Sequence, residues 1–284
     1  MFDYLQPDYI QNFIRTALAE DVGDGDHTAL STIPAEAQGK AQLIIKDTGI
    51  LAGVELAKMI LEEVDNELVV QQFMHDGKAI KYGDIVLKVA GRSQSILKAE
   101  RLLLNCMQRM SGIATFTKSM VDLLDGLPTK LLDTRKTTPN FRLCEKWACK
   151  IGGATNHRYA LFDMILIKDN HVDYAGGIRQ AIEKANDYVR KTGKDLKIEI
   201  EVRNLDELAQ VLKIGGIFRI MLDNFSFENL RKAVEMVGNQ YPTEASGGIN
   251  ETTIRQYAEC GVDYISCGAL THHVKSLDMS LKAY

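Results

Sequence analysis

The sequence of 284 residues contains only five cysteines and no Cys-x-x-Cys pair. An odd number of cysteines without such spacing does not indicate a disulfide framework or a zinc site. It is typical of a protein in a reducing compartment, and we expect the chain to be cytoplasmic. No apolar run approaches the roughly 20 residues of a membrane-spanning helix, so we expect no membrane partner. The first residues also lack the basic and apolar segments of a signal peptide.

Positive charge is not in excess either. Lysine and arginine together number 34, and aspartate and glutamate 38, which gives a formal net charge of −4. An acidic chain is a poor candidate for binding nucleic acid over its whole surface, so we expect no nucleic-acid partner. A site for an anionic ligand must therefore come from a local group of cations. The apolar and charged shares, 45% and 25%, are those of ordinary globular proteins.

Residues 1–112 have the pattern of a small α+β domain. Apolar residues at helical spacing mark three segments: residues 9–20, residues 54–64 and the stretch from residue 95 onward. Runs rich in Ile, Val and Phe predict strands at residues 40–46, 67–74 and 84–89. The last helix should be long and buried, with a kink at Ser111-Gly112. We predict an N-terminal α+β sandwich domain, in which helices cover a sheet.

Residues 113–270 alternate short apolar runs with helical segments. The runs, each a predicted strand, are residues 131–134, 164–168, 198–202, 218–223, 243–246 and 263–267. The helical segments are residues 178–191, 205–213, 227–237 and 251–258, and three of them follow a capping residue, Asn204, Ser226 or Asn250. This alternation predicts βαβ units and a parallel sheet. Because only six strands are recognisable, we predict an incomplete (β/α) barrel as the catalytic domain. Residues 271–284 are expected to pack back on the N-terminal domain.

Polar side chains gather where the predicted strands end. In chain order these are Asp133, Arg135 and Lys136; Lys168, Asp169, Asn170 and His171; Asp223 and Asn224; Ser246, Gly247 and Gly248; and Cys267 and Gly268. In a barrel the carboxyl ends of the strands meet at one mouth, where catalytic residues sit. Polar strand ends could also mark only where the chain leaves for solvent. That alternative does not explain why Lys168, Glu199 and Glu201 lie inside or against apolar runs, so we predict a site at the mouth.

Two clusters of cationic residues suit a ligand with several negative charges. Arg135-Lys136 follows the first strand and precedes two threonines and a proline-set turn. Arginine offers a planar fork to a carboxylate or phosphate, and lysine offers a point charge. His157-Arg158 follows Gly152-Gly153, where the backbone can approach a ligand closely. A solvated surface loop remains an alternative for the first cluster.

Acidic residues form a third candidate group. Glu199 and Glu201 lie on the same side of one predicted strand because side chains alternate along a strand, and Asp223 ends the next strand. Acids in a small parallel strand are costly unless they have partners or a task. Holding a hydrated magnesium ion with substrate phosphates, or the hydroxyls of a sugar, would be such a task. Salt bridges to nearby lysines are the alternative.

A glycine-containing loop is the fourth candidate. Ser246-Gly247-Gly248 precedes the predicted helix capped by Asn250, and Gly268 follows the next strand. Barrels often bind a phosphate group with their last two loops and a helix N-terminus. The motif is shared by many phosphate-binding barrels and so indicates a phosphate more than a particular substrate.

Several strings, taken in order, resemble the signature of the quinolinate phosphoribosyltransferase family, also called nicotinate-nucleotide pyrophosphorylase (carboxylating). They are LAEDVGDGDHT, ERLLLNCMQRMSGIAT, TRKTTP, EKWA, HRYALFDMILIKDNH, EIEVRNLDEL, MLDNFS and ASGGIN. The resemblance covers nearly the whole chain. Asn140 departs from it, because the family has glycine after the proline. Asn tolerates the left-handed backbone conformation best after Gly, so the turn should survive.

The resemblance implies where quinolinate binds. Arg135, His157 and Arg158 would hold its two carboxylates. Arg101 would reach the site from the neighbouring subunit, so the resemblance implies a homodimer with shared active sites, or a higher oligomer.

The resemblance also implies how phosphoribosyl pyrophosphate binds. Lys136 and Lys168 would face the negative charge of the substrates, while Glu201 and Asp223 would hold the ribose hydroxyls and Mg²⁺. The 5-phosphate would lie against Ser246, Gly247, Gly248 and Gly268. Glu199 receives no role.

The implied reaction is the Mg²⁺-dependent transfer of a phosphoribosyl group to quinolinate with decarboxylation, as part of de novo NAD biosynthesis. It would give nicotinate mononucleotide, carbon dioxide and pyrophosphate. Three alternatives stay open. They are a pyrophosphorylase-like paralogue associated with molybdate transport, an isomerase or synthase acting on another phosphorylated substrate, and a non-catalytic sensor of a dicarboxylate or nucleotide.

Overall fold

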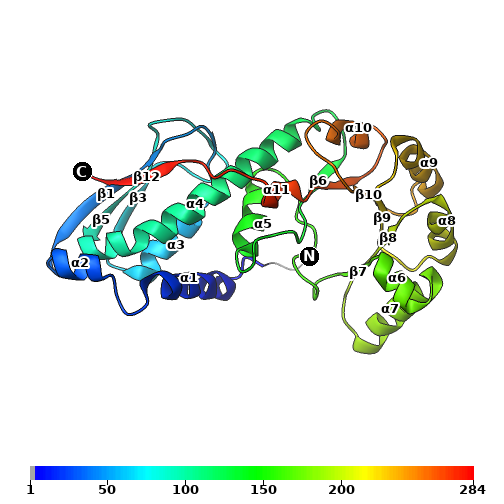
Figure 1. Cartoon of the computed structure of the whole chain (residues 1–284), viewed down its shortest axis with the longest axis horizontal. Coiled ribbons are helices and arrows are strands. Elements are labelled where there is room, and N and C mark those ends of the chain that lie inside the picture. The colour runs from blue at the N-terminus through cyan, green and yellow to red at the C-terminus, as the bar shows by residue number, and fades with distance from the viewer. Residues whose placement is uncertain (1–3) are drawn as a thin grey trace. The chain divides into compact units, whose positions relative to one another are not determined.

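A computed structural model describes residues 4–284, which fall into two compact units (Figure 1). The sheet unit comprises residues 4–118, 137–153 and 270–284, and the barrel unit comprises residues 119–136 and 154–269. Relative to the expected boundary at residue 112, residues 113–118 and 137–153 group with the N-terminal part. Within the described residues, no helix has both the length and the apolar character needed to cross a membrane.

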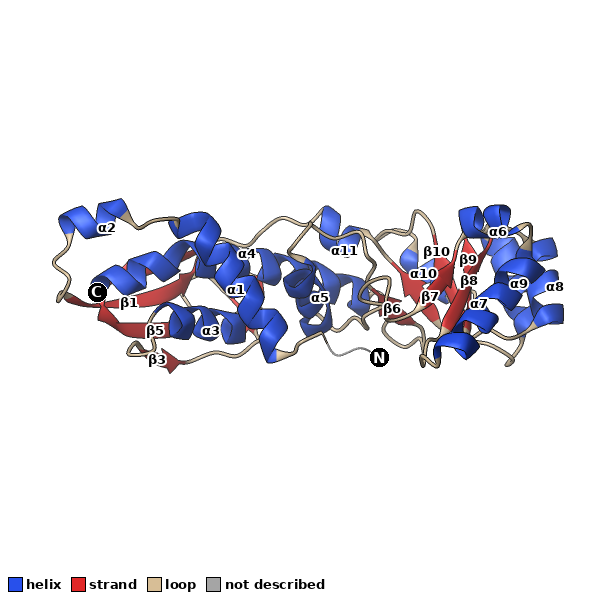
Figure 2. Ribbon diagram, turned by 90° about the horizontal axis from the view of Figure 1, so that it is seen from below, coloured by secondary structure: helices blue, strands red, loops and turns tan. Residues whose placement is uncertain are grey.

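The sheet unit is built on a four-stranded antiparallel sheet. Its strands are β1 (Gln38–Ile45), β3 (Val69–Gln72), β5 (Ile85–Arg92) and β12 (Met279–Ala283), in the order β12-β1-β5-β3, and β2 (Gly49–Ile50) pairs with β4 (Ala79–Ile80). The helices are α1 (Pro7–Val22), α2 (His27–Thr32), α3 (Val54–Val64), α4 (Ser93–Asp122) and α5 (Arg142–Ile151). Leu43 and Ile45 of β1 are fully buried, as are Ile60 of α3 and Met107 of α4, which lie beside the sheet (Figure 2).

Two small residues in the middle of α4 allow close contacts. The helix is continuous from Ser93 to Asp122, through the position where a kink was expected. A Cβ atom on Gly112 would lie 2.2 Å from the carbonyl oxygen of Lys275, so only glycine leaves room for the returning chain. The buried hydroxyl of Ser111 donates to the carbonyl of Ala52 and accepts from its N–H. Both residues therefore serve the packing of α4.

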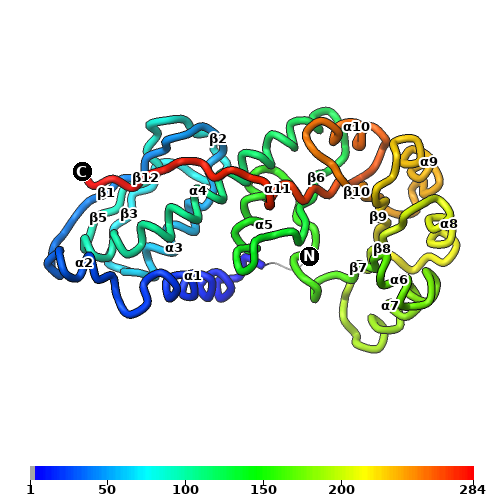
Figure 3. Tube along the Cα trace, in the orientation of Figure 1, coloured from blue at the N-terminus to red at the C-terminus, as the bar shows by residue number. Residues whose placement is uncertain are grey.

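The last residues of the chain return to the first sheet (Figure 3). Arg109 of α4 donates to the carbonyls of Thr271 and Val274, and Gln108 donates to that of Met279. Beyond them β12 pairs antiparallel with β1, with Leu281 opposite Leu43. The C-terminal segment therefore completes the sheet of the sheet unit.

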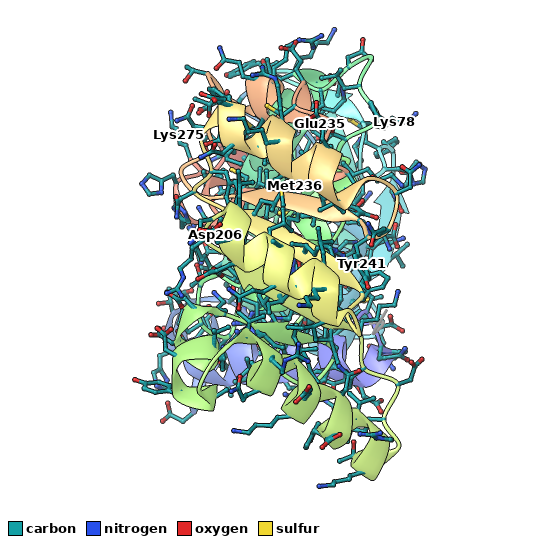
Figure 4. The ribbon with its side chains drawn as sticks, turned by 90° about the vertical axis from the view of Figure 1, so that its right-hand side faces the viewer. Lys78, Asp206, Glu235, Met236, Tyr241 and Lys275 are labelled. Carbon is teal, nitrogen blue, oxygen red and sulfur yellow. The ribbon has the colours of Figure 1, made fainter. Side chains whose placement is uncertain are left out.

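The barrel unit contains a six-stranded parallel sheet. Its strands are β6 (Lys130–Leu132), β7 (Ile165–Ile167), β8 (Ile198–Val202), β9 (Arg219–Asp223), β10 (Thr243–Ser246) and β11 (Tyr264–Ser266), in the order β6-β11-β10-β9-β8-β7. The helices are α6 (Asp169–Ala175), α7 (Ile178–Thr192), α8 (Leu205–Ile214), α9 (Phe227–Val237) and α10 (Ile254–Ala258), and α11 (Ala269–His272) follows the last strand. Figure 4 shows α7, α8 and α9 side by side on the outer side, where Asp206, Glu235 and Met236 point away from the strands. The predicted fold class, an α+β sandwich followed by an incomplete barrel, is confirmed.

The open edge of the barrel is partly filled by residues 154–158. The sheet ends at β6 on one side and β7 on the other. Thr155 lies beside β6, where its N–H donates to the carbonyl of Leu131 and it forms a single parallel bridge with Leu132. This placement carries the following residues, His157 and Arg158, into the barrel wall.

Besides the kink expected in α4, one other local signal was wrong, and three were confirmed. Asn204 and Ser226 cap their helices by accepting from the N–H groups of Glu207 and Asn229. Asn140 has the expected left-handed backbone, with φ of 62°. Asn250 does not cap a helix, because α10 begins only at Ile254, and its side chain accepts from Thr252 N–H within the preceding turn.

Candidate active site at the mouth of the barrel

A cavity of about 440 Å³ lies where the strands of the barrel unit end. Its lining residues are Thr134, Arg135, Lys136, His157, Arg158, Leu166, Lys168, Glu201, Met221, Asp223, Asn224, Glu244, Ser246, Gly247, Gly248 and Ser266. All predicted site residues except Arg101 and Gly268 thus line one cavity. Gly268 follows β11, and Arg101 lies on α4 of the sheet unit with an exposed side chain.

Cationic residues line this cavity from three segments: the loop after β6, the segment with Arg158, and the end of β7, where Lys168 lies. Arg135 and Lys136 follow β6, where the Thr134 hydroxyl accepts from Lys136 N–H at 3.0 Å. Arg158 is almost fully buried, and its guanidinium donates to the carbonyl of Met164 at 3.0 Å. Burial and the positive charge of Arg135 lower the pKa of Arg158. These cations repel one another, so the cavity is suited to an anion that offsets their charge.

Two acids face the same cavity from neighbouring strands. Glu201 is the last residue but one of β8, and Asp223 ends β9. Burial and the negative charge of Asp223 raise the pKa of Glu201, although Lys168 works in the opposite direction. A cation between the two carboxylates would relieve their repulsion, and hard oxygen ligands of this kind suit Mg²⁺. Among the described residues, this pair fits the predicted metal site.

The glycine loop interlocks with the loop after β9. Asn224 N–H donates to the carbonyl of Ser246, and the Asn224 amide donates to Asp223. A Cβ atom on Gly247 would lie 2.1 Å from the side-chain oxygen of Asn224, and Gly247 also has φ of 102°. Glycine is therefore required at this position. Gly248 has φ of 63° and open space around it, which leaves backbone N–H groups of the loop accessible to an anion.

Beneath the cavity lies a buried group of charged side chains, which we call the floor cluster. It consists of Glu199 on β8, Arg219 on β9, Glu244 on β10 and the ring of His157. His157 Nε2 lies 3.0 Å from Glu199 Oε2 and 3.4 Å from Glu244 Oε2, and an Arg219 nitrogen lies 2.7 Å from Glu244 Oε2. Both glutamates have no exposed surface. The salt bridges to lysine considered for Glu199 are thus replaced by His157 and Arg219.

Burial and neighbouring charges act against each other in the floor cluster. Burial disfavours a second proton on the ring of His157, whereas Glu199 and Glu244 favour it. Burial and the charge of Glu244 raise the pKa of Glu199. Although Glu244 is fully buried, His157 and Arg219 lower its pKa to about 2.

The ring of His157 also fixes the neighbouring backbone. Its Nδ1 accepts from Arg158 N–H at 2.7 Å, which places the proton of the ring at Nε2, on the side of the glutamates. The backbone N–H of His157 donates to the fully buried Asp133 at 2.9 Å. Both ring nitrogens therefore face protein atoms. His157 and Arg158 both line the cavity.

Sequence analysis missed Glu244 and Arg219. Both lie inside short apolar runs that were correctly predicted as strands, as Glu199 does. A charged residue within an apolar run indicates a buried charge that needs a partner. The sequence analysis applied this signal to Glu199 but not to Glu244 or Arg219. Asn224 was noted as a strand end, but its interlock with Gly247 depends on loop geometry.

Comparisons with known proteins agree over nearly the whole chain. The family model described as quinolinate phosphoribosyl transferase, N-terminal domain, matches residues 26–111, and the one for the C-terminal domain matches residues 113–282. The chloroplastic nicotinate-nucleotide pyrophosphorylase [carboxylating] of Arabidopsis thaliana is 46% identical over 95% of this chain and 81% of its own. A probable enzyme of the same name from Bacillus subtilis is 39% identical over 92% of this chain and 89% of its own.

Solved structures give the same result. The nicotinate-nucleotide pyrophosphorylase of Francisella tularensis is 38% identical, with a TM-score of 0.90 over 99% of this chain and 98% of the other. The crystal structure of NadC from Streptococcus pyogenes has the same TM-score and 37% identity, over the same shares of both chains.

Proposed function

The chain belongs to the quinolinate phosphoribosyltransferase family, and we infer that it transfers a phosphoribosyl group from phosphoribosyl pyrophosphate to quinolinate. The transfer is accompanied by decarboxylation, gives nicotinate mononucleotide, carbon dioxide and pyrophosphate, and serves NAD biosynthesis. One observation of the site carries this conclusion. Arginines and lysines converge on a cavity of about 440 Å³ that also holds two acids and a glycine loop. Both substrates carry several negative charges, and such a cavity offsets their repulsion.

Quinolinate would bind against the arginines of this cavity. Arg135 and Arg158 are the two forks, and each can pair with one carboxylate through two hydrogen bonds. His157 would support this site through its hold on Arg158, because both of its ring nitrogens face the protein. The arrangement suits a ligand with two carboxylates, because each guanidinium can pair with one of them.

Phosphoribosyl pyrophosphate would occupy the opposite side of the cavity. Lys136 and Lys168 would face its pyrophosphate, and the loop of Ser246, Gly247 and Gly248 would face the 5-phosphate with its N–H groups. Gly268, after the next strand, is part of the same proposal. The helix N-terminus expected there does not contribute, because α10 starts only at Ile254.

Glu201 and Asp223 would hold Mg²⁺ and the ribose hydroxyls. The raised pKa of Glu201 beside Asp223 supports this proposal, because a pair of carboxylates that repel each other favours a cation. When bound, the ion would neutralise charge on the departing pyrophosphate.

The side chains of the cavity serve a reaction that needs no protein nucleophile. The ring nitrogen of quinolinate bonds to C1 of the ribose while the C1–oxygen bond breaks and its electrons leave with pyrophosphate. Lys136 and Lys168 would stabilise that negative charge. The bond from C2 to its carboxylate then breaks, carbon dioxide leaves, and C2 takes up a proton. Arg135 and Arg158 hold the ring in place throughout, so the enzyme acts by clamping and charge compensation.

A homodimer with shared sites, or a higher oligomer built from it, is part of the proposal. Arg101 is exposed on α4 and does not line the cavity of its own barrel unit. An arginine contributed by a partner would add a further cation to each cavity. We further infer a cytoplasmic location, which an odd number of cysteines, five, without a Cys-x-x-Cys pair supports.

The first prediction concerns turnover and specificity. Incubation with quinolinate, phosphoribosyl pyrophosphate and Mg²⁺ should yield nicotinate mononucleotide, whereas a sensor protein would bind quinolinate and form no product. Nicotinate lacks the 2-carboxylate and so offers no anion to one of the two guanidinium groups, and its kcat/KM should be lower by roughly 10⁴-fold. Product formation measured by chromatography decides both points. Comparable use of nicotinate would contradict the assignment of the two arginines.

The second prediction concerns the metal. Asp223→Asn should lower kcat and raise the Mg²⁺ concentration needed for half-maximal activity by about tenfold, because one carboxylate ligand is lost. The matched control is Asp206→Asn, an exposed acid on the outer side of α8 (Figure 4) that should leave the Mg²⁺ titration unchanged. Full wild-type activity in excess chelator would exclude the metal requirement.

The third prediction concerns Arg101 in the site of a partner. Arg101→Ala and Arg135→Ala should each be nearly inactive alone. In a mixed dimer, one site takes Arg135 from one chain and Arg101 from the other and is intact. Random re-pairing makes half of the dimers mixed, so mixing should restore roughly a quarter of wild-type activity. If activity stays at the level of the separate variants after verified subunit exchange, Arg101 does not act across an interface.

A further inference from the structure

Two members of the floor cluster, Glu199 and Arg219, have no direct part in the proposed reaction. Glu199 and Arg219 lie below the lining of the cavity, and neither can touch a substrate there. Keeping two carboxylates without exposed surface inside a barrel is costly, because desolvation disfavours each charge by several kcal/mol. The same three strands could have carried apolar side chains. We therefore expect the charged side chains of the cluster to have a role other than packing.

A chain of contacts leads from the glutamates to the cavity. Glu199 and Glu244 hold His157 Nε2 from below, at 3.0 and 3.4 Å. On the other side of the ring, Nδ1 accepts from Arg158 N–H at 2.7 Å. If the ring rotated, the glutamates and this N–H would lose their partner together. The direction of the ring and the backbone of Arg158 are thus coupled.

A metal ion is a poor alternative for this cluster. His157, Glu199 and Glu244 offer ligand atoms within 4.8 Å of one another, as a metal site would. Arg219 already occupies that environment, 2.7 Å from Glu244 and 3.9 Å from Glu199. Its guanidinium already supplies a positive charge to the two carboxylates, and a divalent ion beside it would leave an excess of buried positive charge.

We propose that Glu199 and Glu244 are positioning residues that act through the ring of His157 to hold Arg158 where quinolinate binds. The proposal rests on the proposed function for its kinetic test. It gives the buried acids a task in substrate specificity. Arg158 would bind a carboxylate in one orientation because its backbone is held by the ring and its guanidinium is held by the carbonyl of Met164.

The test compares Glu244→Gln with the wild type. Glutamine keeps the shape of the side chain but removes its charge, so it should loosen the ring of His157. KM for quinolinate should rise about tenfold, while KM for phosphoribosyl pyrophosphate should change less than twofold. Glu235→Gln, on the outer side of α9 (Figure 4), is the matched control and should change neither. Glu199→Gln is the second variant, with the same expected result, in case the first does not fold.

A double-mutant cycle tests whether the glutamate acts through Arg158. In Arg158→Lys, which lacks the planar fork, adding Glu244→Gln should raise KM for quinolinate by less than twofold. A tenfold increase in that background as well would overturn the proposal, because the glutamate would then act independently of Arg158. An equal rise in both KM values would also overturn it, since a general loss of barrel structure has that effect.

Further measurements distinguish a failure of the positioning role from a failure of the proposed function. A wild type that neither binds quinolinate in calorimetry nor turns it over would refute the proposed function. A wild type that does both, with unchanged KM for quinolinate in both folded glutamine variants, would refute the positioning role alone. Stoichiometric transition metal in the purified wild type that is lost in Glu199→Gln would also overturn the proposal, because the cluster would then be a metal site.

Discussion

Charge buried inside the barrel has to be balanced, and much of the site follows from that constraint. Glu199 and Glu244 have no exposed surface, and one guanidinium from Arg219 cannot neutralise both. The second partner of both carboxylates is Nε2 of His157, a residue from outside the six strands. To supply its ring, residues 154–158 must enter the open edge beside β6. The same segment then delivers Arg158, so the cationic wall depends on the acids beneath it.

Strand periodicity arranges these groups in two layers. Glu199 and Glu201 lie two residues apart on β8, so they point to the same side about 7 Å apart along the strand. Glu244 and Ser246 have the same two-residue spacing on β10. On β9, Arg219 lies opposite Glu199 and Asp223 lies opposite Ser246. Side chains of the lower layer compensate one another, while those of the mouth remain available to ligands. Residues two positions apart on one strand, such as Glu199 and Glu201, thus have different tasks.

Sequence patterns predicted the barrel and most of its mouth for a physical reason. Short strands buried on both faces are uniformly apolar, so Lys168, Glu201 and Asp223 stand out against them. Signals that depend on contacts distant in the sequence could not be found in this way. Helix α5 was not predicted, because its buried face includes Glu145 and Lys146 and so breaks the apolar periodicity. The direction of the His157 ring depends on three strands and could not be predicted from any one of them.

The roles of glycine residues also depend on contacts between segments that are distant in the sequence. Gly112 was interpreted as a helix kink, whereas its lack of a side chain admits the backbone of Lys275, 163 residues further along the chain. Gly247 was assigned to phosphate binding, and it must also be glycine because of Asn224. Asn140, in contrast, was correctly assigned, because a left-handed turn after proline is a local property. Local backbone preference can therefore be inferred from the sequence alone, whereas close approach between distant segments needs the fold. The floor cluster belongs to the second kind, since its four members come from separate segments and only their packing makes each charge tolerable.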